Sequence, residues 1–134
     1  MISVDMNYWA VLVAAVAAQA IAGIWYSALF GQRWQANSGR TLSGVASRAR
    51  RGQLIAFLCN WVRAGVIAWL AYGLGVGTLL PAVQLGLGIG LGLAVAGMIP
   101  HYYFSGHTRQ LLLIDAGQVL AAVLAMTLIV SLWR

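Results

Sequence analysis

Four apolar stretches, separated by one sizeable polar connection and two short breaks, limit what this chain of 134 residues can fold into. They cover about residues 8–30, 53–75, 81–104 and 110–133. A helix of about 20 residues crosses a hydrocarbon core of about 30 Å. Backbone polar groups in lipid must be satisfied within the protein, which favours helices for such spans. The pattern predicts an all-α integral membrane protein, a four-transmembrane-helix antiparallel bundle that forms one membrane domain over residues 1–134.

The charge distribution agrees with a membrane location and predicts an orientation. Only 7% of the residues are charged and 62% are hydrophobic, which leaves too little polar surface to cover a soluble protein. Taken alone, the net charge of +6 would suggest a nucleic-acid partner. Most of the arginines, however, lie in the connection 31–52, namely Arg33, Arg40, Arg48, Arg50 and Arg51.

The positive-inside rule places such a connection in the cytoplasm. We therefore expect a cytoplasmic loop over residues 31–52 and both termini outside. A short surface helix around residues 42–51 is one possibility for this loop, and a solvated loop is the other. The expected partner is the lipid bilayer, with no nucleic acid.

The third span carries glycines on two faces. At helical spacing one stripe contains Gly86, Gly90, Ala94, Gly97 and His101, and Gly88 and Gly92 fall on the opposite side. Small residues let membrane helices approach closely. We expect the first stripe to pack within the protomer. The second face is then left for self-association through the third span.

Polar residues recur in the inner half of the predicted membrane region. The helical rise places Asp115 about 9 Å, Asn60 about 10 Å and Arg63 about 15 Å from the cytoplasmic ends of their spans. An ionised side chain at the bilayer centre costs roughly 2.5–3.5 kcal/mol on the insertion scale, so such groups face protein or water. The candidate polar intramembrane cluster is Tyr26, Asn60, Arg63, His101, Asp115 and Gln118.

Two interpretations of this cluster stay open. In the first, the six residues line an inward-open polar cavity or ion path. In the second, they form a buried hydrogen-bonded plug in which Arg63 pairs with Asp115.

Catalytic and metal-binding patterns are missing from the sequence. It contains no H-E-x-x-H motif, no paired catalytic carboxylates and no nucleophile beside a base, and two histidines are too few for a metal set. The alternating glycines lack the preceding strand of a nucleotide-binding loop. The single Cys59 lies in an apolar span, where helix packing is its expected role. We expect no enzymatic activity, no metal and no cofactor.

Short aromatic and glycine motifs give the chain a family resemblance. They are Trp25-Tyr26-Ser27 followed by Phe30-Gly31 and Trp34, and Tyr102-Tyr103-Phe104-x-Gly106 leading into Leu113-Ile114-Asp115-Ala116-Gly117. In order and spacing they resemble the two signature regions of a bacterial membrane family catalogued as domain of unknown function 1761. The resemblance implies a small four-helix protein of the bacterial inner membrane and no established activity.

Two functions are compatible with these features. The first is a homo-oligomeric conduit or transporter-like protein for a small ion or solute. The second is a non-transporting membrane scaffold or accessory subunit that binds other membrane helices.

Overall fold

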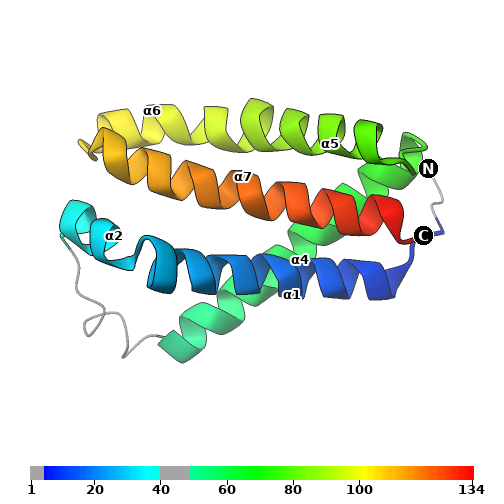
Figure 1. The fold of residues 1–134 in the computed structure, drawn as a ribbon, viewed down its shortest axis with the longest axis horizontal. Coiled ribbons are helices and arrows are strands. Elements are labelled where there is room, and N and C mark those ends of the chain that lie inside the picture. Colours follow the sequence, from blue (N-terminus) through cyan, green and yellow to red (C-terminus); the bar gives the residue numbers. More distant parts are fainter. Residues whose placement is uncertain (1–4, 40–48) are drawn as a thin grey trace.

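The computed structural model describes residues 5–39 and 49–134, and within them the fold is helical and contains no strand (Figure 1). Four helical segments are long and apolar enough to cross a membrane: Tyr8–Leu29, Arg50–Gly73, Leu79–Phe104 and Arg109–Leu132. The predicted fold class, an all-α membrane protein with four spans, is confirmed. The orientation of its termini stays a prediction.

The first span is not a uniform α-helix. It consists of α1 (Tyr8–Ile24) and the π-helical segment η1 (Trp25–Leu29), and a short helix α2 (Gly31–Ser38) follows. The side chain of Asn7 accepts hydrogen bonds from the backbone N–H groups of Trp9 and Ala10, at 3.1 and 3.2 Å, and so caps α1. In η1, the backbone N–H of Phe30 donates to the carbonyl of Trp25, five residues earlier, at 2.9 Å.

The other three spans follow in antiparallel order. The second is α4 (Ala49–Gly73), the third is built from α5 (Leu79–Leu87), η2 (Gly88–Val95) and α6 (Ala96–Phe104), and the fourth is α7 (Arg109–Leu132). Gly75 and Gly106 lie in the two tight turns with φ of 69° and 72°, a conformation that favours glycine. Short turns of this kind require neighbouring spans to run in opposite directions.

Helix α7 is the centre of the bundle. It contacts α1, α4, α5 and η2 (Figure 1). The core between these helices is rich in alanine, which allows close helix approach: Ala10, Ala14, Ala15, Ala18, Ala64, Ala68, Ala71, Ala82 and Ala122 are buried. Helix α4 runs obliquely across the other spans, and its first half diverges from the bundle (Figure 1).

Hydrogen bonds join residues near both chain ends to each other, to the end of α4 and to the turn that follows it. Asn7 Nδ2 donates to the carbonyl of Trp133 at 3.5 Å, and the hydroxyl of Tyr72 accepts from the backbone N–H of Asn7 at 3.2 Å. Arg134 donates to the carbonyl of Val76 and lies over the Tyr72 ring, 4.9 Å from its centroid. This end of the bundle is therefore closed by contacts within the chain.

The third span departs from the first of the two glycine stripes expected from the sequence, the one that ends at His101. Gly86 and Gly90 do face α7: a Cβ there would lie 2.9 Å from Leu124 Cδ2 and 2.6 Å from Leu120 Cδ1, respectively. A Cβ at Gly97 would have no neighbour within 4 Å, and His101 is exposed. The physical reason is η2, because wider π-helical turns change the helix phase and move later residues off the stripe.

The opposite glycine face is open. A Cβ at Gly88 or at Gly92 would meet nothing within 4 Å. Nothing in the described residues covers these two positions.

The ends of the connection 31–52 are helical. Residues 31–38 form α2, which is capped by Gly39 with φ of 70°, and residues 49–52 belong to α4. Both described ends of the expected loop are therefore helical. Of the surface helix considered around residues 42–51, residues 42–48 lie outside the described part of the chain.

Candidate functional site

Two polar groups occur within the bundle. The first is the tyrosine–aspartate cluster, formed by Tyr26 of η1, Tyr102 of α6 and Asp115 of α7. The hydroxyl of Tyr26 donates to Asp115 Oδ1 at 2.7 Å, and the hydroxyl of Tyr102 donates to Asp115 Oδ2. Each carboxylate oxygen thus has its own donor, and charge-assisted bonds of this kind are the stronger ones. The cluster joins three helical segments through one carboxylate.

Tight packing around Trp25 supports this cluster. Trp25 Nε1 donates to the carbonyl of Ile114 at 2.9 Å, one residue before Asp115. A Cβ at Gly117 would lie 2.9 Å from Trp25 Cζ2, so the indole lies directly against the backbone of α7. Glycine at position 117 is what permits this approach.

A second glycine, Gly31, allows the backbone after η1 to pack closely against the backbone of Tyr26. A Cβ at Gly31 would lie 2.8 Å from the carbonyl oxygen of Tyr26. The ring of Trp34 lies edge-on to the ring of Tyr26, with centroids 6.0 Å apart. The π-helical turn, Gly31 and Trp34 together hold the Tyr26 side chain in position.

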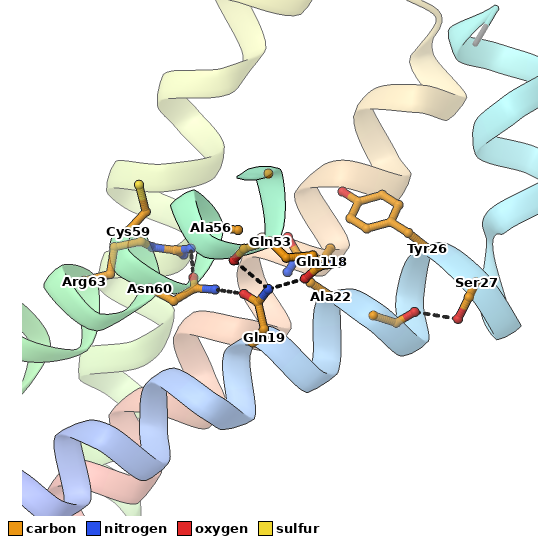
Figure 2. A pocket seen from close by; sticks show the side chains of 12 residues that line it. Gln19, Ala22, Tyr26, Ser27, Gln53, Ala56, Cys59, Asn60, Arg63 and Gln118 are labelled. Carbon is orange, nitrogen blue, oxygen red and sulfur yellow. Dashed lines mark hydrogen bonds between the residues drawn. The ribbon is translucent and has the colours of Figure 1, made fainter. Parts of the chain in front are cut away.

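The second polar group surrounds a cavity of about 700 Å³ between α1, η1 and the diverging half of α4, which we call the arginine cavity (Figure 2). Its lining residues are Gln19, Ala22, Gly23, Tyr26, Ser27, Gly52, Gln53, Ala56, Cys59, Asn60, Arg63 and Gln118. Most come from α1, η1 and α4, and Gln118 is contributed by α7. The cavity is therefore set within three of the four membrane-spanning segments.

A hydrogen-bonded chain runs along one wall of this cavity (Figure 2). Arg63 Nη1 donates to Asn60 Oδ1 at 3.0 Å, and Asn60 Nδ2 donates to Gln19 Oε1 at 3.0 Å. Gln19 Nε2 donates to Gln53 Oε1 at 2.5 Å and to the Gln53 backbone carbonyl at 3.3 Å. Asn60 is buried, Arg63 is half-buried and Gln53 is exposed. The chain thus links the half-buried cation to the rim of the cavity.

The structure divides the six candidate residues between different places. Tyr26, Asn60, Arg63 and Gln118 line the arginine cavity. Asp115 lies in the tyrosine–aspartate cluster, and Tyr26 is the one residue that takes part in both. His101 is exposed, and its ring centroid lies 6.0 Å from that of Tyr102.

The ion pair between Arg63 and Asp115, which belonged to the second interpretation of the cluster, does not form. Among residues 5–39 and 49–134, Arg63 hydrogen-bonds to Asn60, and Asp115 hydrogen-bonds to Tyr26 and Tyr102. The reason is geometric. Asp115 faces η1 and α6, whereas Arg63 lies on the oblique α4, where the nearest acceptor is one helical turn away.

Sequence reasoning missed four residues of these groups. Tyr102 was not among the candidate residues, and its hydroxyl binds Asp115. Cys59 was expected to pack between helices, and it is exposed on the cavity. Gln19 and Gln53 carry the hydrogen-bonded chain. An amide within an apolar span was the available signal for Gln19, and no comparable signal marked the other three.

The motifs that carry the family resemblance meet in space. Trp25, Tyr26 and Gly31 come from the first region, and Tyr102, Asp115 and Gly117 come from the second. They pack against one another or bond directly at the tyrosine–aspartate cluster. The two regions therefore form one structural unit.

Comparison with known proteins identifies a family. No curated protein and no solved structure matches the chain. The sequence profile of the family described as "Protein of unknown function (DUF1761)" matches residues 9–131, which is nearly the whole chain and includes both motif regions. The chain therefore belongs to the DUF1761 family.

Proposed function

We propose that this protein is a homo-oligomeric conduit for a small ion or solute in the bacterial inner membrane, and that the arginine cavity is its entry chamber. The observation that carries the proposal is the cavity itself, about 700 Å³ within membrane-spanning segments and lined by a guanidinium and four amides. Ligand pockets commonly enclose about 300–1,000 Å³. An ionisable residue in a span that faces a cavity is typical of a solute pathway.

The arginines of the connection 31–52 support an opening toward the cytoplasm. The cavity lies between the second half of α1 with η1 and the first half of α4, and these segments flank that connection. If the positive-inside rule holds here, the cavity mouth is cytoplasmic. The role proposed is binding and passage of a solute, without catalysis.

Packing in the other half of the bundle argues for an oligomer. Ala14, Ala15 and Ala18 of α1 are fully buried there, so one protomer closes above the cavity. A continuous path would then run between protomers. The open glycine face at Gly88 and Gly92 offers a surface on which a second copy can approach closely.

The test uses the single native cysteine as a plug. Purified protein in liposomes would be assayed for chloride efflux and for glycerol-driven swelling, before and after reaction of Cys59 with N-ethylmaleimide. We expect flux of at least one probe above that of protein-free liposomes, and its loss after modification. The matched control, Cys59→Ala, should conduct and should be insensitive to the reagent. Fluxes equal to those of protein-free liposomes for both probes would overturn the proposal.

A second measurement addresses assembly. Native mass spectrometry in lipid nanodiscs should show an oligomer that Gly88→Leu dissociates into folded monomers. Gly90→Leu is the matched variant, and it should damage folding itself because its side chain would collide with Leu120. A protein that is monomeric without substitution would contradict the homo-oligomeric conduit.

The alternative function is a non-transporting scaffold or accessory subunit. The observation that favours it is the same open face at Gly88 and Gly92, which fits a helix of another protein as well as a second copy. A monomer without flux would support this alternative over the conduit.

A further inference from the structure

The arginine cavity contains one formal charge and no carboxylate among its described lining residues. Among the described residues that line it, Arg63 is the only one with a charged side chain. The chain has two acidic residues in total, Asp5 and Asp115. Asp115 is engaged by two phenol hydroxyls and does not line the cavity, and Asp5 precedes α1 at the far end of the bundle. No side-chain carboxylate of the protein therefore neutralises Arg63.

The direction of the hydrogen-bonded chain follows from Arg63. A guanidinium only donates, so the oxygen of Asn60 must face it. The amide nitrogen of Asn60 then points to Gln19, whose oxygen accepts and whose nitrogen in turn donates to Gln53. All three bonds have their donor on the side of the half-buried cation and their acceptor toward the rim (Figure 2). Each amide uses its oxygen as the acceptor within the chain.

The cavity is consequently rich in donors and positive in charge. The remaining guanidinium N–H groups of Arg63 and the amide nitrogen of Gln53 have no acceptor among the described residues, and Gln118 adds a further amide from α7. A half-buried cation without a counter-ion is unfavourable in a low-dielectric setting. A guanidinium is also well shaped for bidentate contact with an oxyanion.

We propose that the arginine cavity binds an oxyanion of the phosphate type, with Arg63 as its main ligand. This inference rests on the proposed function, because it names the class of solute that the entry chamber accepts. The phosphate group has two possible sources, a free anion from the aqueous phase and the headgroup of an anionic phospholipid. Both present the same oxygens to Arg63.

The native Cys59 reports the charge of the cavity. It is the only cysteine in the chain, it is exposed, and it lines the cavity one helical turn from Arg63. Its rates of reaction with an anionic sulfonatoethyl and a cationic trimethylammonioethyl methanethiosulfonate would be compared in phosphatidylcholine nanodiscs. Both reagents react with the thiolate form of Cys59. A change in thiol ionisation therefore alters both rates by the same factor and leaves their ratio unchanged.

Replacement of Arg63 should change this ratio. We expect Arg63→Gln to lower the anionic-to-cationic rate ratio by about tenfold, from Coulomb's law for one nearby charge in a partly aqueous setting. Arg63→Lys keeps the cation and should retain most of the ratio. Arg109→Gln, an exposed arginine at the start of α7, is the matched control for general surface charge and should change the ratio less than about twofold. A ratio unchanged by Arg63→Gln would overturn the proposal.

Protection experiments then separate the two sources. If the ligand is a free anion, inorganic phosphate should slow the sulfonate reagent at Cys59 in phosphatidylcholine nanodiscs. If it is a lipid headgroup, protection should require phosphatidylglycerol in the nanodisc and be insensitive to added phosphate. In either case Arg63→Gln should abolish the protection. Absence of protection by both probes would overturn the anion site.

These results are separable from those of the flux assay. Protection without flux would mean an anion site in a protein that is not a conduit. Flux of glycerol without protection would leave the conduit in place and contradict the anion as its solute.

Discussion

The tyrosine–aspartate cluster and the arginine cavity each contain one charged side chain, and the two side chains differ in how fully the protein provides their hydrogen-bond partners. In the cluster, one carboxylate receives a phenol hydroxyl on each oxygen. In the cavity, one guanidinium has a single neutral acceptor among the described residues, beside open space of about 700 Å³. In the cluster, other residues of the protein satisfy the charged group. In the cavity, hydrogen-bond donors remain available for a ligand. Four predictions test this difference, in order of decreasing effect.

The largest effect is expected from loss of the carboxylate in the cluster. Asp115→Ala should lower the free energy of unfolding by about 3 kcal/mol, because two phenols lose a charged acceptor. Arg63→Leu is the matched change in the cavity, and it should alter stability by less than about 1 kcal/mol because it removes a cation that lacks a counter-ion. Denaturant titration in mixed micelles would measure both. Equal losses would mean that the two sites do not differ as described.

A glycine pair tests whether the cluster is tightly packed and the cavity open. Gly117→Ala should cost about 1–2 kcal/mol, because the new Cβ would lie 2.9 Å from Trp25 Cζ2 and displace the indole. Gly23→Ala, on the cavity wall, has no neighbour within 4 Å and should be neutral or stabilising by up to about 1 kcal/mol. The fluorescence of Trp25, with the other tryptophans as a shared background, should change in the first variant only. The opposite order of stabilities would contradict the comparison.

Removal of a single phenol hydroxyl should lower the free energy of unfolding less than removal of the Asp115 carboxylate does. Tyr102→Phe removes one hydrogen bond to Asp115 and should cost about 1 kcal/mol. Tyr103→Phe is the control, since its side chain is 81% exposed and its substitution should change the unfolding free energy by less than about 0.5 kcal/mol. In the Asp115→Ala background the effect of Tyr102→Phe should shrink, which a double-mutant cycle would measure. A cost that persists without the carboxylate would place the hydroxyl in some other interaction.

The smallest expected effect is the coupling between the two sites. Arg63 and Asp115 share no contact or hydrogen-bond partner among the described residues. The losses in Arg63→Leu and Asp115→Ala should therefore add in the double variant to within about 0.5 kcal/mol. Strongly non-additive losses in the same unfolding assay would indicate that Arg63 and Asp115 do interact, as the second interpretation of the sequence required.

Much of the fold was predictable from local features of the chain. Each span is a largely apolar stretch of sufficient length, and the last two connections are short, so the number of spans and their antiparallel order follow from the sequence. The motifs around Trp25 and Asp115 also identify the family, since its profile matches residues 9–131. These properties depend on neighbouring residues or on their order, and no knowledge of helix contacts is needed.

The partners of the polar side chains depend on helix phase and crossing angle. The π-helical segments η1 and η2 change the direction in which later residues point, so regular helical spacing misplaced Gly97 and His101. The oblique course of α4 separates Arg63 from Asp115 and opens the cavity beside it (Figure 1). A few degrees of rotation or tilt decide which donors meet which acceptors, and these quantities are set by the packing of all four spans together. The polar residues could thus be named from the sequence, and only the folded bundle decides which of them bond to each other and which face a cavity.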